Sequence, residues 1–524
     1  MVFKKIMFII NHGLIKSKIK RRIFMFNSKS FKKVMCLFLT LVMVVPFAFT
    51  GCGKKGNDTA GKDGEVKDPK DLKPYELTWY TIGTPQKDTD KVMEELSKYT
   101  KEKINATVKM QIIDWDKYTE KVKVMLQSGE KADLVFTCSW ALPYEQLVSQ
   151  KMLLPLDDLL DKYGQGIKKE IDPMFIDGNK IDGKLYAIAN NKELSPETRW
   201  VFNKNLVDKY NLDVSKVQSL ESLEPLLKTV KENEPSITDI YGADCGFYTM
   251  DDPVIGGNVP LVVPYDSTDY KIQDWFEIPR VHDELKTMHE YYKKGYIRKD
   301  VATFGGIDRG KTDKWFVKIE GCLPYYDEGE KAAGRTPVVS VPMFDQTYVS
   351  NFHVPGSMIG IPVTSKDPDR AMMFLNMLNT DPYVRNLVNS GIEGVHYEKK
   401  DGKKHVLPAG TQNYDVPSFS LGNIFILDLG ESDPDDLYDQ YKKFNAAQKR
   451  SPIFGFKANL DPIKKEVSAF ENIWQEFGKL ITEGVVDIDE VYPKYMAKMK
   501  AAGYDKVKAE LQKQLDQWVK DNKK

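Results

Sequence analysis

The stretch LTWYTI (77–82) begins the part of the chain that decides the fold. A helical pattern follows it, and two more apolar segments, ATVKMQII (106–113) and ADLVFTC (132–138), come next with a second helical pattern between them. Strands that alternate with amphipathic helices form parallel sheets covered by helices. The sequence therefore predicts an α/β fold.

A second lobe is predicted to begin after DGKLYAIANNKE (182–193), where RWVFNK (199–204) starts a new strand. Helical patterns follow near 219–233 and 281–294, and short strands return at 314–326 and 336–344. A strand then leads into a helix within 358–378. We assign residues 75–188 and about 303–351 to a first lobe, residues 189–302 and about 352–390 to a second lobe, and residues 391–524 to a C-terminal domain.

The end of the chain is predicted to be helical. Two apolar stripes recur at helical spacing, and such stripes usually pack into a core. The first contains Val467, Phe470, Trp474, Phe477 and Ile481, and the second contains Leu511, Leu515 and Trp518.

The N-terminus has the features of a secretory signal. Residues 34–49 are apolar except for Thr40, follow three lysines, and are too few to span a membrane comfortably. Thr50, Gly51 and Cys52 come directly after them, and small residues before a cysteine resemble bacterial lipoprotein signals, so we expect cleavage before Cys52 and lipidation of that residue. Residues 52–74 are rich in Gly, Lys and Asp and predict a flexible tether.

The formal net charge of zero conceals an acidic mature chain. Residues 1–51 hold ten Lys or Arg residues and no Asp or Glu, so the rest carries 66 basic and 76 acidic residues, a net charge of −10. Nucleic-acid binding needs a clustered basic surface, so no nucleic-acid partner is expected.

Cysteine and histidine do not indicate a catalytic or metal centre. Cys138, Cys245 and Cys322 are widely separated and predict buried thiols rather than a disulfide framework. His282 and His289 stand seven residues apart, which is not the zinc-binding spacing. We expect no metal, no cofactor and no catalytic residue.

The order of these segments resembles the extracellular solute-binding proteins of ABC importers, family 1. The terminal region resembles a subgroup with an additional, poorly characterised C-terminal domain. The matching blocks are ADLVFTCSW (132–140), MLLPLDDLLDKYG (152–164), DGKLYAI (182–188), RWVFNKNL (199–206), SKDPDRAMMFLNMLNTDP (365–382), GIEGVHY (391–397), LGNIFI (421–426), SPIFGF (451–456) and MAKMKAAGYDKV (496–507).

The resemblance implies a two-lobed, type II periplasmic-binding-protein-like fold with a hinge, a central ligand cleft and a helical C-terminal extension. It also implies a monomer, lipid-anchored on the extracellular face of the membrane of a Gram-positive bacterium. Such a protein delivers a sugar or oligosaccharide to the permease subunits of an importer.

The ligand site is expected where strands end, because ligands of open α/β sheets bind beyond the carboxyl ends of the strands. Sugars need aromatic faces for their C–H surfaces and polar groups for their hydroxyls. Trp140 is the strongest candidate because it directly follows a strand. The stacking candidates are Tyr80, Trp115, Trp140, Trp200, Tyr325 and Tyr326, and the polar candidates are Asp114, Glu193, Arg199, Asn203, Asp327 and Glu393.

Three other functions are compatible with the sequence. A secreted glycoside hydrolase would use two carboxylates, and acidic residues are abundant, although no catalytic motif indicates one. A peptide-binding protein on the same scaffold would rely on backbone edges and charge pairs. A sensor that presents its ligand to a membrane kinase is a further alternative.

Overall fold

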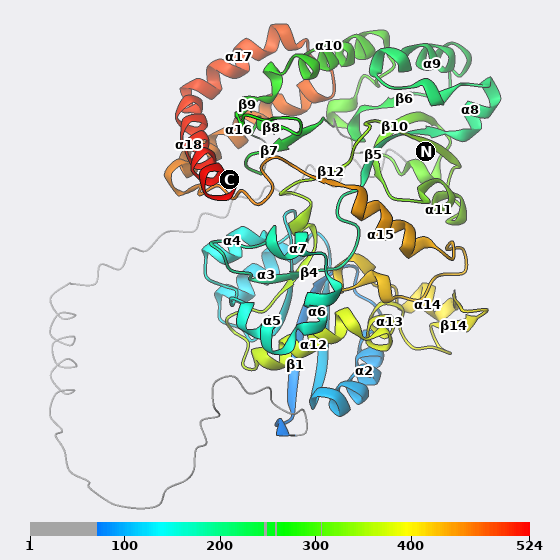
Figure 1. Cartoon of the computed structure of the whole chain (residues 1–524). Helices are drawn as coiled ribbons and strands as arrows, with labels where there is room; N and C mark the ends of the chain where they lie inside the picture. Colours follow the sequence, from blue (N-terminus) through cyan, green and yellow to red (C-terminus); the bar gives the residue numbers. More distant parts are fainter. Residues whose placement is uncertain (1–70, 246–248, 257–258, 305, 524) are drawn as a thin grey trace, which may run out of the picture. The chain divides into compact units, whose positions relative to one another are not determined.

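The computed structural model describes residues 71–245, 249–256, 259–304 and 306–523. The predicted signal, Cys52 and nearly all of the predicted tether lie outside the described residues. Three groups of elements, each with its own hydrophobic core, make up the described chain (Figure 1). We call them the first lobe, the second lobe and the C-terminal helical domain. Among the described residues, no helix is long and apolar enough to cross a membrane.

The first lobe is built on a five-stranded sheet with the order β2-β1-β3-β13-β4. β1 pairs in parallel with β2 and β3, whereas β13 is antiparallel to both of its neighbours. The strands are β1 (Tyr75–Ile82), β2 (Ala106–Ile113), β3 (Leu134–Thr137), β4 (Ala187–Ala189) and β13 (Met358–Gly360). The main helices are α2 (Thr89–Ile104), α3 (Tyr118–Gln127), α4 (Tyr144–Ser149), α5 (Asp157–Tyr163), α6 (Gln165–Glu170), α7 (Pro173–Asp177), α12 (Pro368–Thr380) and α13 (Pro382–Ser390).

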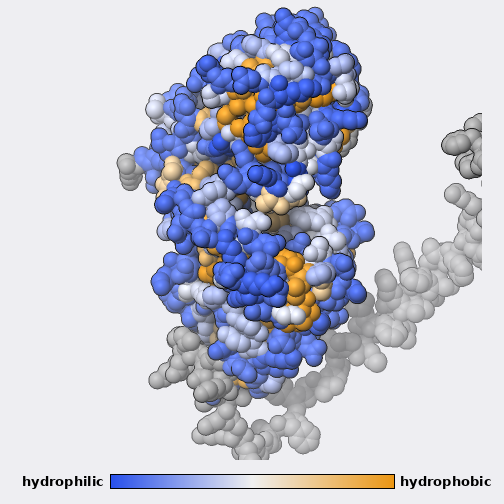
Figure 2. All heavy atoms as spheres, turned by 90° about the vertical axis from the view of Figure 1, so that its right-hand side faces the viewer, coloured by the Kyte–Doolittle hydropathy of each residue, from blue (hydrophilic) through white to orange (hydrophobic). Residues whose placement is uncertain are grey.

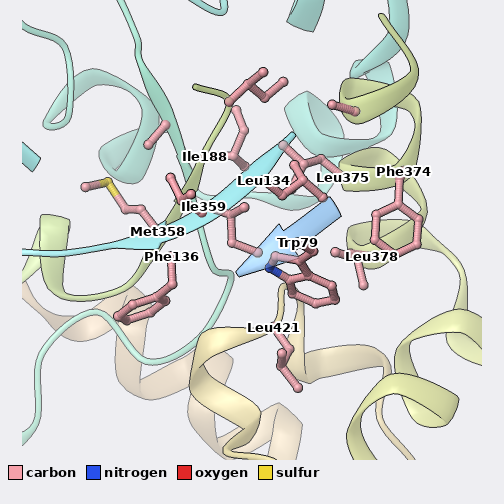
Figure 3. Packing of buried hydrophobic residues seen from close by; sticks show 14 of the residues in the cluster. Trp79, Leu134, Phe136, Ile188, Met358, Ile359, Phe374, Leu375, Leu378 and Leu421 are labelled. Atoms are coloured by element: carbon pink, nitrogen blue, oxygen red, sulfur yellow. The ribbon is translucent and has the colours of Figure 1, made fainter. Parts of the chain in front are cut away.

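Burial follows the position of each strand in this sheet. Residues 77–82 of β1 are buried on both faces, as expected for an inner parallel strand, whereas β2 at the edge alternates between buried and accessible residues. The helix α12 covers the sheet and is itself buried over most of its surface. Figure 3 shows Trp79 of β1 beside Phe374 and Leu378 of α12 in this core, and the Trp79 and Phe374 rings meet edge to face at 5.8 Å.

The second lobe contains a four-stranded sheet with the order β11-β5-β10-β6. β5 lies between two antiparallel neighbours, and β10 and β6 run parallel. The elements are β5 (Glu197–Asn203), α8 (Lys204–Tyr210), α9 (Leu220–Asn233), β6 (Asp239–Gly242), α10 (Pro279–Lys294), β10 (Trp315–Cys322), α11 (Tyr326–Ala332) and β11 (Val338–Pro342).

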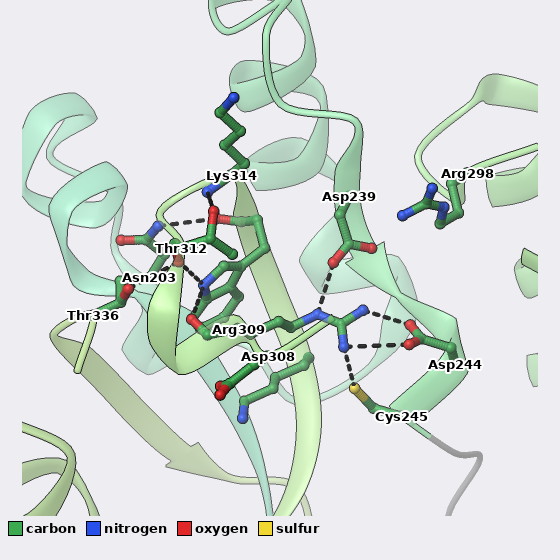
Figure 4. Close-up of polar contacts among 12 residues, drawn as sticks. Asn203, Asp239, Asp244, Cys245, Arg298, Asp308, Arg309, Thr312, Lys314 and Thr336 are labelled. Atoms are coloured by element: carbon green, nitrogen blue, oxygen red, sulfur yellow. Dashed lines mark hydrogen bonds and ion pairs between the residues drawn. The ribbon is translucent and has the colours of Figure 1, made fainter. Parts of the chain in front are cut away.

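A buried guanidinium stabilises the loops beside this sheet. Arg309 donates from Nε to Asp239 Oδ2 at 2.7 Å and also pairs with Asp244 (Figure 4). Its carbonyl accepts the indole N–H of Trp315 at 2.8 Å. Burial raises the pKa of Asp239, and the hydrogen bond from Arg309 opposes that rise. Arg309 also donates to the thiol of Cys245, which was predicted to be buried but is partly accessible.

The C-terminal helical domain packs on a three-stranded sheet with the order β7-β8-β9. The side chains of Phe276, Phe470 and Leu511 are buried in this shared core. The elements are β7 (Asp251–Pro253), β8 (Leu261–Pro264), β9 (Gln273–Asp274), α16 (Lys464–Thr482), α17 (Ile488–Ala501) and α18 (Tyr504–Asn522).

Three segments connect the lobes. They are the chain between β4 and β5, the chain between β11 and β13, which contains β12 (Tyr348–Val349), and the segment with α15 (Leu437–Ala447) and β16 (Lys449–Arg450). β12 and β16 pair in parallel. Asn445 joins two of the segments, because its side chain accepts from Leu194 N–H at 3.0 Å and donates to Lys192 C=O at 3.1 Å.

The predicted lobe boundaries need correction. β10 and β11, within 303–351, pair with β5 and belong to the second lobe, whereas β13 and α12, within 352–390, belong to the first. The predicted C-terminal domain is also not one unit. Tyr414 and Leu421 are buried in the first-lobe core, and only the later helices form the C-terminal helical domain.

Candidate ligand-binding site

Two exposed indoles lie together beyond the carboxyl ends of two parallel strands of the first lobe, β2 and β3, which flank β1. Trp115 follows β2 and Trp140 follows β3, and their side chains are 45% and 47% exposed. Their ring centroids are 6.3 Å apart and their planes differ by 21°. Phe419 lies 6.1 Å from each ring. We call Trp115, Trp140 and Phe419 the aromatic platform.

Backbone contacts hold the platform against the loop that precedes β13. The indole N–H of Trp140 donates to Gly356 C=O at 2.8 Å, and Ser139 N–H donates to Pro355 C=O at 2.8 Å. Phe352 of the same loop is 54% exposed. The face of the molecule in Figure 2 is largely hydrophilic, with separate hydrophobic areas. A contiguous group of exposed aromatic rings is typical of an interaction site.

A cavity of about 410 Å³ lies beside this loop, and we call it the hinge cavity. Its size is within the range of small-ligand sites. Phe352 lines it, so the cavity and the loop that holds the platform share a residue. The complete lining is Ser195, Pro196, Glu197, Thr198, Thr249, Met250, Asp251, Pro253, Val259, Pro260, Val262, Tyr265, Trp275, Gly321, Phe344, Gln346, Thr347, Tyr348, Ser350, Phe352, His353 and Trp474.

The lining combines aromatic rings with hydrogen-bonding groups. Tyr265 and Tyr348 stack with centroids 4.5 Å apart and planes 10° from parallel. Asp251 is paired with Arg280 at 2.6 Å, and the indole N–H of Trp275 donates to Thr249 Oγ1 at 2.8 Å. Apolar faces with a few fixed polar groups suit a ligand that carries both C–H surfaces and hydroxyls.

The histidine in the cavity wall is neutral at physiological pH. Burial lowers the pKa of His353 to about 4. Its Nδ1 accepts from Ser350 N–H at 3.2 Å, which places the ring proton on Nε2, 3.4 Å from Ser195 Oγ. Within the described chain, no group of three or more His, Cys, Asp or Glu side chains could hold a metal ion.

The structure removes three predicted residues from the site. Tyr80 and Trp200 are 3% and 0% exposed and pack in the cores of the first and second lobes, so neither ring face is available to a ligand. Asn203 is fully buried, where its side-chain amide donates to the carbonyls of Asp313 and Trp315.

The remaining predicted residues fall into separate places. Trp115 and Trp140 form the platform, and Asp114 precedes Trp115 at the end of β2. Arg199 lies on β5 and pairs with Glu197, which lines the cavity. None of the twelve predicted residues is itself in the cavity lining.

Five others lie further along the connecting segments or on the surface. Glu193 pairs with Lys192 beside Asn445. The remaining four make local contacts: Tyr325 donates to Asp436, Tyr326 donates to Glu320, Asp327 accepts from Ser340, and Glu393 is exposed on a turn that bridges to Tyr397.

Sequence reasoning missed the aromatic residues of the hinge cavity. Trp474 was assigned to a core stripe, and Phe470 and Ile481 of that stripe are indeed buried, but Trp474 is partly accessible and lines the cavity. Trp275 follows β9 directly, so the strand-end argument that identified Trp140 could also have identified Trp275.

Comparison with known proteins gives two matching family models. The bacterial extracellular solute-binding protein model matches residues 83–384, and a domain of unknown function, DUF3502, matches residues 452–520. A carbohydrate ABC transporter substrate-binding protein of Streptococcus pneumoniae serotype 4 (strain ATCC BAA-334 / TIGR4) is 32% identical over 498 residues, which cover 92% of this chain and 97% of the relative.

Solved structures of the N-glycan transport solute-binding protein NgtS from Streptococcus pneumoniae are also similar. One has a TM-score of 0.80 and 32% identity, covering 86% of this chain and 100% of the other. The complex of NgtS with Man5GlcNAc has a TM-score of 0.69 at the same identity, covering 86% of this chain and 99% of the other. These matches confirm the predicted family, the two-lobed fold and the C-terminal extension. The chain belongs to the bacterial extracellular solute-binding protein family.

Proposed function

We propose that this chain is the oligosaccharide-binding lipoprotein of an ABC importer, and that its ligand is a mannose-containing glycan of the kind that NgtS binds. The observation that carries the proposal is the aromatic platform beside the hinge cavity. Trp115 and Trp140 present exposed faces at the strand ends where a ligand of this fold class binds.

The hinge cavity supplies hydrogen-bonding groups, which the aromatic platform lacks. Glu197, Asp251 and Gln346 bring carboxylate and amide groups to the cavity wall, and such groups hydrogen-bond to sugar hydroxyls. We expect an oligosaccharide to lie on the platform and to extend past Phe352 into the cavity. Binding rather than catalysis is the proposed role.

Ligand binding is proposed to close the lobes about the three connecting segments. A ligand that contacts the first lobe and the cavity together favours the closed arrangement. Conversion of an open-to-closed population of 99:1 into 1:99 requires a ligand that binds the closed state about 5.5 kcal/mol more tightly than the open state. A micromolar affinity corresponds to about 8.2 kcal/mol, so a ligand whose contacts form mainly in the closed state can supply this difference.

The chain is further proposed to be retained on the extracellular face of the membrane by a lipid on Cys52. The supporting features are the apolar run at 34–49, the Gly51–Cys52 pair and the polar segment that follows. Anchoring next to the importer would let the closed form deliver its ligand to the permease subunits.

Isothermal titration calorimetry with Man5GlcNAc tests the binding proposal. We expect binding by the wild-type chain and at least about tenfold weaker binding by Trp140→Ala, because the loss of a stacking ring removes about 1.4 kcal/mol or more. Tyr383→Ala is the matched control, since Tyr383 is an exposed aromatic residue of the first lobe outside the platform.

Other outcomes identify the alternatives. Chromatography of the recovered glycan would detect turnover, and turnover would make the chain a glycoside hydrolase. Failure to bind Man5GlcNAc and other glycans, with binding of short peptides, would replace the proposal with a peptide-binding function.

A further inference from the structure

One wall of the hinge cavity comes from the C-terminal helical domain. Trp474 belongs to α16, inside the DUF3502 match at 452–520, and it lines the cavity together with residues of the second lobe and the connecting segments. Its ring is only partly buried. The unassigned domain thus exposes an indole to the space where the proposed ligand would lie.

This indole is held against the segment that follows β9. Phe276 stacks on Trp474 with centroids 6.0 Å apart and planes 17° from parallel. Phe276 directly follows Trp275, which also lines the cavity. The domain is fixed at the same strand by Tyr504, whose hydroxyl donates to the buried carboxylate of Asp274 at 2.6 Å. The two tryptophans therefore belong to one packed unit.

The local sequence of α16 makes room for the indole. Gly478 lies one turn after Trp474, and a Cβ atom added to Gly478 would overlap the indole ring. Glycine inside a helix costs up to about 1 kcal/mol relative to alanine. The absence of a side chain at 478 lets the Trp474 ring lie against its own helix.

We propose that the C-terminal helical domain is part of the ligand site, with Trp474 as a glycan-contacting, specificity-determining residue and Gly478 as its positioning residue. The inference rests on the proposed function and extends it, because it gives the DUF3502 region a role in choosing the oligosaccharide. The chemistry is stacking of an indole face on a sugar ring, as on the aromatic platform.

The test is calorimetric titration of the full mature chain with Man5GlcNAc. Trp474→Ala is expected to weaken binding by about tenfold, and Trp474→Phe to retain most of the affinity, because an aromatic face remains. Gly478→Ala is expected to weaken binding by several-fold without loss of thermal stability, since alanine favours the helix but displaces the indole.

Trp518→Ala is the matched control. Trp518 belongs to the same domain and its ring contacts Phe456, but it is not in the cavity lining. Trp518→Ala is expected to bind Man5GlcNAc like the wild-type chain.

Unchanged affinity of a folded Trp474→Ala variant, with binding by the wild-type chain, would overturn this inference alone. Equal losses in Trp474→Ala and Trp518→Ala would also overturn it, because they would show a general effect of the domain. Absence of glycan binding by the wild-type chain would overturn the proposed function and this inference with it.

Discussion

The indoles of Trp115 and Trp140 lie almost parallel, 6.3 Å apart, although they follow different strands of the first sheet. Because β1 separates β2 from β3, the two rings meet across a strand that contributes no ring to the platform. The two rings meet because the sheet places β2 and β3 on either side of β1. Their contact creates one continuous apolar face from two residues that are 25 positions apart in the sequence.

The two rings are expected to act together in binding. Trp115→Ala and Trp140→Ala should each weaken Man5GlcNAc binding, and the double variant should lose less than the sum, with a coupling of about 0.5–1.5 kcal/mol. Calorimetric titration of the four proteins measures this cycle. Strictly additive losses would show that the rings contact the ligand independently.

A buried carboxylate is expected to make stability depend on pH. Burial raises the pKa of Asp252 to about 7, although Ser451 donates to it. The Asp252 carboxyl therefore binds its proton more tightly in the folded chain than in the unfolded chain, where its pKa is about 3.9. This proton contributes to the free energy of unfolding in full below about pH 3.9, and the contribution is lost as the pH rises to about 7.

Asp252→Asn removes this dependence. The wild-type chain should lose stability between pH 4.5 and pH 8, whereas the variant should not lose this contribution. The melting temperature of Asp252→Asn relative to the wild-type chain should therefore rise over this range, as measured by differential scanning fluorimetry. Asp435→Asn, at an exposed position, should show no such increase. A constant difference for Asp252→Asn would contradict the assigned titration.

The hydroxyl of Tyr504 is expected to contribute strongly to the stability of the C-terminal helical domain. Tyr504→Phe leaves the buried carboxylate of Asp274 without this donor, and loss of a hydrogen bond to a charged group costs about 1.5–3 kcal/mol. Urea unfolding measures the change. Tyr492→Phe is the control and should cost less, because its partner Glu277 is exposed. Equal effects of the two variants would show that the burial of Asp274 does not matter.

The lipid anchor is tested by Cys52→Ser in the full-length chain. This variant should move from the membrane fraction to the medium when the chain is expressed in a Gram-positive host. Cys36→Ser, within the apolar run, should stay with the membrane. Retention of Cys52→Ser on the membrane would exclude Cys52 as the anchoring residue.

The sequence was sufficient for most of the elements and for part of the candidate site. Trp140 could be predicted because a residue after a buried strand leaves the core, and this argument depends only on local pattern. Trp200 was predicted to stack on the ligand from the start of a strand, but it lies inside β5, where its ring is buried. β5 has a neighbour on each side and its residues 200–203 are fully buried, which the pattern of a short strand does not reveal.

Long-range pairing explains the other differences. β10 and β13 are both rich in apolar residues, so nothing local indicates which sheet each one joins, and the predicted lobes exchanged them. Trp474 has the helical spacing of a core residue. Its exposure depends on the cavity formed by distant residues such as Thr249 and Tyr348, which only the folded chain brings together.

The position of β13 in the first sheet has a consequence for the order in which the chain can fold. β3 ends at Thr137, but β13, which fills the place between β3 and β4, begins only at Met358. Pairing across so many residues is slow, because the loop must close before the contact stabilises anything. During synthesis, β3 therefore stays without its partner β13 until most of the protein has been made. That delay keeps the first lobe unfolded for longer and would favour the export proposed for this chain, because polypeptides are threaded across a membrane in the unfolded state.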